Sequence, residues 1–268
     1  MTRLEPILFF SDPALAERAW HSGVRHFIVD WENKEKAARQ RGFDTQINDH
    51  GVTELRVLRA LVDGLVSCRV NALGPWTALE VEQALAAGAT TLFLPMVKSP
   101  GQVDAFLRQI DGRAQAAILV ETPEACACAT ELASFPLAMV YVGLNDLAIA
   151  RGSRSIFSAL ADGTVDRLRE CFSSHAFGAA GLTRLDAGAP IPFALLLAEL
   201  ERLDCRFTFA RRSFERDMAE RDIAAELAKI DRAWDALRLR TAAERQATHA
   251  RFAAAVDDDE RRLRVSGP

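Results

Sequence analysis

Mainly apolar runs of four to seven residues alternate along the chain with segments that carry apolar residues at helical spacing. Runs without polar alternation are typical of parallel strands that are buried on both faces. An alternation of eight such strands with helices predicts a (β/α)8 TIM barrel, which takes about 250 residues. The predicted strands are Pro6–Phe10, His26–Asp30, Val66–Ala72, Thr91–Met96, Ala116–Val120, Leu137–Val142, Phe177–Leu182 and Arg206–Phe209.

The segments between the strands begin and end with helix signals such as Asp12-Pro13, which supplies an N-cap and a proline at the first helical position. The predicted helices are Ala14–His21, Thr53–Leu65, Thr77–Ala87, Pro100–Ile110, Glu124–Ser134, Val165–Phe172, Pro190–Leu203 and Ile223–Leu239. The charged segment Lys34–His50 is predicted to lie over the barrel mouth as a loop or short helix. An open doubly wound sheet is the alternative, but neither a G-x-G-x-x-G after the first strand nor a G-x-x-x-x-G-K-[ST] is present.

Helix formers with alternating charge continue over Thr241–Leu263, beyond what eight strand and helix units require. We therefore predict a barrel catalytic domain over residues 1–240 and a C-terminal helical extension over residues 241–268. Trp234 and Leu237 lie on an otherwise charged surface, which suggests that this end of the chain packs on a neighbouring subunit.

The composition narrows the classes of partner. A net charge of −4 and a pI of about 5.8 give no electrostatic reason to expect nucleic-acid binding. No apolar run approaches 18 residues and no leader is visible, so we expect no membrane association. Five cysteines in apolar segments are best explained as reduced thiols in a cytoplasmic protein.

Two acidic residues follow neighbouring predicted strands. Glu121 comes directly after Ala116–Val120, and Asp146 follows Leu137–Val142. The carboxyl ends of parallel strands form the functional face of such folds, so these carboxylates should converge on one rim. They would repel one another unless a cation lay between them, and carboxylate oxygens suit Mg²⁺ or Mn²⁺. The alternative is that each merely caps the helix that follows it.

An arginine interrupts the third predicted strand. Arg69 is costly to bury unless it faces a counter-charge or a ligand, so we predict an inward, charge-paired side chain rather than a solvent-facing strand end. The acidic turn after the second strand, with Asp30 and Glu32, offers carboxylates that could orient this arginine or bound water. Helix capping is the alternative role for both acids.

Five stretches in this order resemble the HpcH/HpaI aldolase and citrate lyase β-subunit family, part of the phosphoenolpyruvate/pyruvate-type barrel superfamily. They are Asp30-Trp31-Glu32, Cys68-Arg69-Val70-Asn71, Leu94-Pro95-Met96-Val97, Val120-Glu121-Thr122-Pro123-Glu124-Ala125 and Gly143-Leu144-Asn145-Asp146-Leu147-Ala148, within residues 5–215. The segment after Glu32 and the segment Arg211–Phe214 depart from the family pattern, which indicates a divergent branch.

The resemblance implies a metal-dependent carbon–carbon lyase or aldolase. Glu121 and Asp146 would hold Mg²⁺ or Mn²⁺, and Arg69 would sit over the same substrate oxygen of a 2-oxo acid of the pyruvate type. In aldolase members a histidine follows the second-strand acidic motif. Asn33 occupies that place here, so His50 is the nearest candidate for proton transfer, with a metal-bound water as the alternative.

The motifs of the resemblance also bring Pro95, Gly143 and Asn145 to the edge of the site as candidate substrate-binding residues. Arg212, just past the last strand, could contact a substrate acid group or form a structural salt bridge. The resemblance further implies a homo-oligomer, a trimer or hexamer that exchanges its last helix. An acyl-CoA thioester lyase of the citramalyl or malyl type, and a catalytically degenerate barrel that acts as a binding subunit, are the alternative functions.

Overall fold

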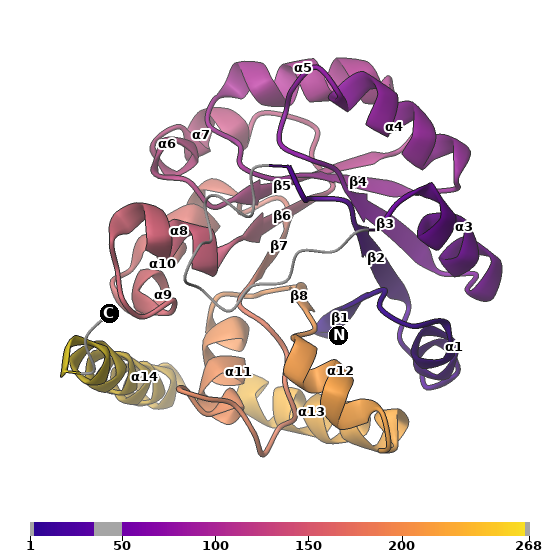
Figure 1. Cartoon of the computed structure of the whole chain (residues 1–268). Helices are drawn as coiled ribbons and strands as arrows, with labels where there is room; N and C mark the ends of the chain where they lie inside the picture. The colour runs from indigo at the N-terminus through magenta and orange to yellow at the C-terminus, as the bar shows by residue number, and fades with distance from the viewer. Residues whose placement is uncertain (1–2, 35–49, 266–268) are drawn as a thin grey trace.

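The computed structural model describes residues 3–34 and 50–265, and most of the predicted mouth segment lies outside these residues. Eight parallel strands form a closed barrel in chain order (Figure 1). Because β1 pairs with β8 as well as with β2, the open doubly wound alternative is wrong and the predicted TIM barrel is confirmed. The strands are β1 (Glu5–Phe9), β2 (His26–Asp30), β3 (Leu65–Arg69), β4 (Thr91–Leu94), β5 (Gln115–Val120), β6 (Met139–Val142), β7 (Ala176–Ala179) and β8 (Phe207–Phe209).

Helices surround the barrel on its outside (Figure 1). They are α1 (Pro13–His21), α3 (Val52–Leu61), α4 (Thr77–Ala86), α5 (Pro100–Ile110), α6 (Pro123–Ala127), α7 (Ala129–Leu132), α8 (Leu144–Arg151), α9 (Ser158–Ala161), α10 (Thr164–Cys171), α11 (Phe193–Arg202), α12 (Arg212–Met218), α13 (Ile223–Arg238) and α14 (Ala242–Val265). The helices that the structure describes include none with the length and apolar character of a membrane-spanning segment.

Some element boundaries differ from the predictions. The single predicted helix Glu124–Ser134 is broken into α6 and α7 at Cys128, whose backbone is not helical. The predicted helix Thr53–Leu65 ends at Leu61, because Val62 is extended and Leu65 already belongs to β3. The third strand ends at Arg69 instead of Ala72, so the arginine lies at the carboxyl end of β3.

Two apolar layers hold the barrel together. The larger layer packs between the strands and the surrounding helices, and the smaller one fills the barrel interior. Phe209 is central to the interior layer, since its ring lies 5.2 Å from that of Phe9, 5.8 Å from that of Phe93 and 4.0 Å from that of Tyr141. These aromatic rings close the barrel below the carboxyl ends of the strands, so the site above them has a packed floor.

The predicted C-terminal helix is present as α14, which packs on α11. Glu201 of α11 accepts hydrogen bonds from Arg240 and Arg245, both at 2.8 Å, and the Glu199 carboxylate lies 2.9 Å from His249 Nδ1. The expectation that Trp234 packs on a neighbouring subunit is wrong, because its own chain buries it to 3% exposure. The homo-oligomer remains a prediction.

Candidate active site

A cavity of about 640 Å³ lies at the carboxyl ends of the strands. Its volume falls in the range of small-molecule sites, about 300–1,000 Å³. Apolar side chains form its floor and charged side chains its walls. The described lining includes the floor residues Phe9, Leu119, Tyr141 and Phe209, the acids Asp30, Glu32, Glu121, Asp146 and Glu215, and the arginines Arg69, Arg211, Arg212 and Arg216.

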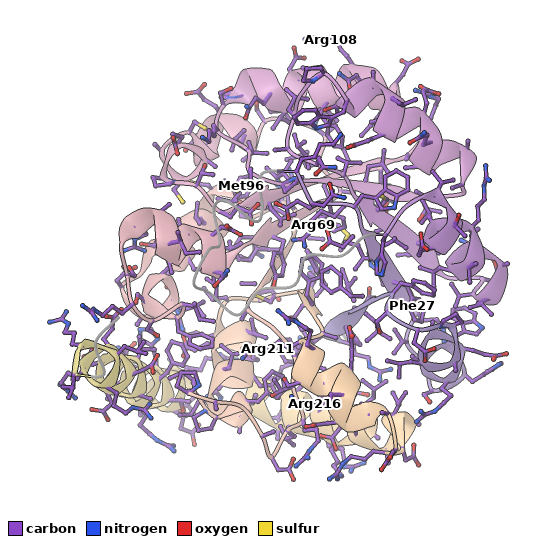
Figure 2. All side chains as sticks on the ribbon, in the orientation of Figure 1. Phe27, Arg69, Met96, Arg108, Arg211 and Arg216 are labelled. Atoms are coloured by element: carbon purple, nitrogen blue, oxygen red, sulfur yellow. The ribbon has the colours of Figure 1, made fainter. Side chains whose placement is uncertain are left out.

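Arg69 projects into this cavity from the end of β3 and is held by a two-point contact. Its Nε and Nη2 donate to the two carboxylate oxygens of Asp30 at 2.8 and 2.7 Å, and Glu32 Oε2 lies 3.5 Å from Nε. Burial alone would lower the pKa of Arg69, but the carboxylates of Asp30 and Glu32 outweigh burial and raise it. The predicted inward, charge-paired arginine is confirmed, and Figure 2 shows it at the barrel mouth.

Glu121 lies at the end of β5 and is only 3% exposed. Its Oε1 accepts a hydrogen bond of 2.8 Å from the backbone N–H of Met96, a residue in the left-handed region with φ of 54°. Burial and the nearby carboxylates of Asp146 and Glu32 raise the pKa of Glu121 to about 8. This carboxylate is therefore placed where a positive charge would stabilise its ionised form.

Gly143 makes room for the Glu121 side chain. A Cβ atom at position 143 would lie 2.2 Å from Glu121 Oε2 and 2.8 Å from Glu121 Cβ. The backbone N–H of Gly143 donates to the carbonyl oxygen of Val120, which fixes the turn after β6 against the end of β5. Only a residue without a side chain fits between the two strand ends at this point.

Asp146 lies in the first turn of α8, so it does not cap the helix from outside, as the capping alternative supposed. It lines the cavity together with Glu121. Their oxygens are hard donors of the kind that Mg²⁺ and Mn²⁺ prefer, and mutual repulsion contributes to the raised pKa of Glu121. The pair therefore fits a divalent cation. Within residues 3–34 and 50–265, no group of three or more His, Cys, Asp and Glu side chains forms a complete protein cage for one.

A polar clamp joins the ends of β2 and β3. Asn71 Oδ1 accepts hydrogen bonds from the backbone N–H groups of Asn33 and Lys34 at 3.0 and 2.8 Å. Its Nδ2 donates to the Trp31 carbonyl oxygen and to Glu80 Oε1, both at 2.9 Å. The clamp fixes the backbone on either side of the pair formed by Arg69 and Asp30. Its key residue, Asn71, was identified in the sequence as part of a motif but without a role.

Two further cavity residues were missed in the sequence. The Tyr141 hydroxyl donates a hydrogen bond to the carbonyl oxygen of Ala180, and burial raises the pKa of Tyr141. Glu215 of α12 is half-buried, and loss of solvent around its carboxyl group raises its pKa to about 7 against the opposing effects of Ser11 and Arg212. Neither residue follows a strand directly within a recognisable motif, so only the folded register could reveal them.

Some of the other predicted site residues line the cavity and some do not. Asn145 and Arg212 line the cavity. His50 packs edge-on against Phe10 with ring centroids 6.2 Å apart and is not among the residues that line the cavity. Pro95, the first residue after β4, is buried and also lies outside the cavity lining. Roles for His50 and Pro95 therefore stay predictions.

Comparison of the sequence with family models and with curated proteins gives no match. The structure, in contrast, is similar to solved structures over most of its length. Citrate synthase SbnG is similar with a TM-score of 0.60 and 18% identity, over 87% of this chain and 95% of that one. RipC from Yersinia pestis is similar with a TM-score of 0.57 and 15% identity, over 90% and 97% of the two chains.

An HpcH/HpaI aldolase from Desulfitobacterium hafniense DCB-2 is similar with a TM-score of 0.57 and 13% identity, over 90% of this chain and 94% of that one. The fold is that of an HpcH/HpaI aldolase. The resemblance predicted from the five sequence motifs is thus confirmed for the fold. In this barrel, Arg69, Glu121 and Asp146 line one cavity although the first and the last are 77 positions apart in the sequence.

Proposed function

We propose that the chain is a member of the HpcH/HpaI family and a metal-dependent aldolase that cleaves or forms a carbon–carbon bond next to a 2-oxo acid of the pyruvate type. The observation that supports it most directly is the convergence of Arg69, Glu121 and Asp146 on one cavity above an apolar floor. The aldolase and the citrate synthase among the structural neighbours also support this class of reaction.

The reaction places negative charge on one oxygen. In the cleavage direction, a general base takes the hydroxyl proton of the aldol, and the electron pair of the carbon–carbon bond moves onto the 2-oxo oxygen, which releases an aldehyde. The resulting enolate takes up a proton on carbon to give the oxo acid. Glu121 and Asp146 would hold Mg²⁺ or Mn²⁺, which supplies positive charge beside this oxygen.

Arg69 supplies the second positive charge. Asp30 fixes its guanidinium through two hydrogen bonds, so little reorganisation is needed when charge develops on the substrate. The apolar floor formed by Phe9, Leu119 and Phe209 excludes water below the site, which strengthens these electrostatic interactions.

Chelation tests the metal dependence. Pyruvate release from a hydroxylated 2-oxo acid should fall by about 10²-fold or more after exhaustive treatment with EDTA, because one source of charge stabilisation is removed. Activity should return when Mg²⁺ or Mn²⁺ is added in excess. Full activity after chelation would contradict the metal role of Glu121 and Asp146.

The two-point contact of Arg69 gives a second test. Arg69→Lys should lower kcat by about 10²-fold, because a lysine ammonium cannot bridge both oxygens of Asp30 and also face the substrate. Arg113→Lys is the matched control, since Arg113 makes a comparable two-point pair with Glu82 on the exposed surface. Steady-state kinetics should show little change for the control, and equal activity of both variants would argue against the proposal.

A thioester lyase uses the same enolate chemistry and is distinguished by its substrate. If malyl-CoA or citramalyl-CoA raised the melting temperature and were cleaved faster than free hydroxylated oxo acids, the thioester alternative would replace the aldolase proposal. Metal binding without turnover of either class would favour a binding subunit.

A further inference from the structure

Acids predominate on one side of the cavity and arginines on the other, although Arg69 lies on the acidic side and Glu215 lies on α12. The acids Asp30, Glu32, Glu121 and Asp146 come from the ends of β2, β5 and β6. On the opposite side, three arginines lie in the segment after β8, and we call Arg211, Arg212 and Arg216 the arginine rim. Figure 2 shows Arg211 and Arg216 on the α12 side of the mouth, across from Met96. A cavity with two walls of opposite charge suits a substrate with two chemically different ends.

The arginine rim is held in place from two sides. The Arg211 stem lies over Gly181, where an added Cβ atom would come within 2.6 Å of Arg211 Cγ. The backbone N–H of Arg211 donates to the Leu182 carbonyl oxygen at 2.9 Å. At the other end of α12, Arg18 donates to the carbonyl oxygens of Met218 and Arg221 at 3.0 and 2.9 Å. The segment that carries the rim is therefore anchored to the segment just after β7 and to α1.

We infer that the arginine rim binds a phosphate monoester on the substrate half opposite the 2-oxo acid, so that the acceptor aldehyde is a phosphorylated one. This inference rests on the proposed aldolase function. The two parallel N–H donors of a single guanidinium group match a carboxylate. A phosphate monoester carries nearly two negative charges and three acceptor oxygens, so it requires more donors. Three arginines and Ser213 line this part of the cavity, and together they carry enough charge and hydrogen-bond donors to match the larger anion.

The size of the cavity supports the same conclusion. A three-carbon oxo acid held at Arg69 and the metal ligands occupies a small part of 640 Å³. The remaining space extends past Ile156, Phe157 and Ala210 to the arginine rim. Burial raises the pKa of Glu215 to about 7, so this carboxylate is partly neutral near pH 7 and opposes an anion less than an ordinary glutamate would.

The test compares glycolaldehyde phosphate with glycolaldehyde and succinic semialdehyde as acceptors for pyruvate. We expect kcat/KM for the phosphorylated aldehyde to exceed that for glycolaldehyde by about 10²-fold or more, since each charge-assisted hydrogen bond contributes about tenfold or more. In Arg211→Gln and Arg216→Gln this value should fall about tenfold to a hundredfold, and the value for glycolaldehyde should fall by a clearly smaller factor. Arg108→Gln, an arginine on the outer surface of α5, is the matched control (Figure 2).

The outcomes separate this inference from the proposed function. Deuterium exchange of the pyruvate methyl protons, followed by NMR, needs only the 2-oxo acid half of the site. If exchange occurs but the three aldehydes react alike, or succinic semialdehyde is preferred, the phosphate subsite is wrong and the aldolase proposal stands. If exchange is absent with Mg²⁺ and Mn²⁺, the aldolase proposal itself is contradicted. Equal losses for all aldehydes in Arg211→Gln would also overturn the subsite.

Discussion

Replacement of Glu121 by glutamine is expected to lower activity by about 10³-fold and to abolish stabilisation by Mg²⁺. The amide keeps the size of the carboxylate and can still accept the hydrogen bond from the Met96 N–H. It lacks the negative charge that a divalent cation requires as a partner. Isothermal titration with Mg²⁺ and steady-state kinetics measure the two effects. Glu124→Gln, which changes an exposed neighbouring carboxylate, is the control and should behave like the unmodified protein.

The same substitution should stabilise the metal-free protein, and the sign follows from the pKa of Glu121. This pKa rises from 4.5 in the unfolded chain to about 8 in the fold. The folded state therefore binds the proton of Glu121 more tightly than the unfolded chain does. The free energy of unfolding that this proton contributes is lost as the pH rises from about 4.5 to about 8. Glutamine stays neutral, so by pH 8 the free energy of unfolding of the variant should exceed that of wild type by on the order of a few kcal/mol.

Thermal unfolding in EDTA from pH 5 to pH 9 checks this. The melting temperature of Glu121→Gln minus that of wild type should increase up to about pH 8 and then level off. Saturating Mg²⁺ should reverse the order at high pH, because only the wild type gains from binding. If the difference in melting temperature between Glu121→Gln and wild type did not vary with pH, Glu121 would be ionised in the metal-free fold at every pH tested.

Gly143→Ala should have the second largest effect. The new methyl group would lie 2.2 Å from Glu121 Oε2, and the glutamate would have to leave its hydrogen bond with Met96. We expect about a 10²-fold loss of activity from the displaced carboxylate and about 1–3 kcal/mol lower stability from overpacking. Steady-state kinetics measures the loss of activity, and denaturant unfolding measures the loss of stability. If Gly143→Ala bound Mg²⁺ with the affinity of wild type, the steric argument would be wrong.

Gly101→Ala is the matched control for that experiment. Gly101 lies in the first turn of α5, where an added Cβ atom meets nothing closer than 3.9 Å. Alanine favours a helix over glycine by about 1 kcal/mol, so the control should be equal to wild type or slightly more stable. Contrasting results at the two positions would assign the loss to contact with Glu121 and not to removal of a glycine.

The fold could be predicted because every parallel strand is buried on both faces and therefore leaves an apolar run in the sequence. The core of the site followed from the same rule, since Arg69, Glu121 and Asp146 each lie at or just beyond a strand end. The prediction for Asp146 was less accurate, since this residue lies inside the first turn of α8. The start of α8 leaves no signal in the sequence, because Gly143 caps it without a side-chain hydrogen bond. α12 was missed for the same reason, as Arg211 caps it without a side-chain hydrogen bond.

Contacts between distant segments could not be predicted. The clamp between Asn71 and Glu80 depends on how the end of β3 faces α4, and the partner of the Tyr141 hydroxyl is a backbone carbonyl on the neighbouring strand end. Neither contact leaves a spacing signal in the sequence. Glu215 was missed because its burial depends on how α12 packs beside Ser11. These details decide the charge balance of the site, whereas the strand pattern decides only its location.

The aromatic floor around Phe209 has a kinetic consequence. With the barrel closed below, both halves of a substrate enter and leave through the same mouth. Arg69 is 13% exposed and lies deep, whereas Arg216 at the rim is 78% exposed. In the proposed aldolase reaction, the 2-oxo acid would then arrive first and depart last, which predicts an ordered mechanism. In the cleavage direction the aldehyde is released first, and added aldehyde should give noncompetitive product inhibition while pyruvate competes with the intact substrate.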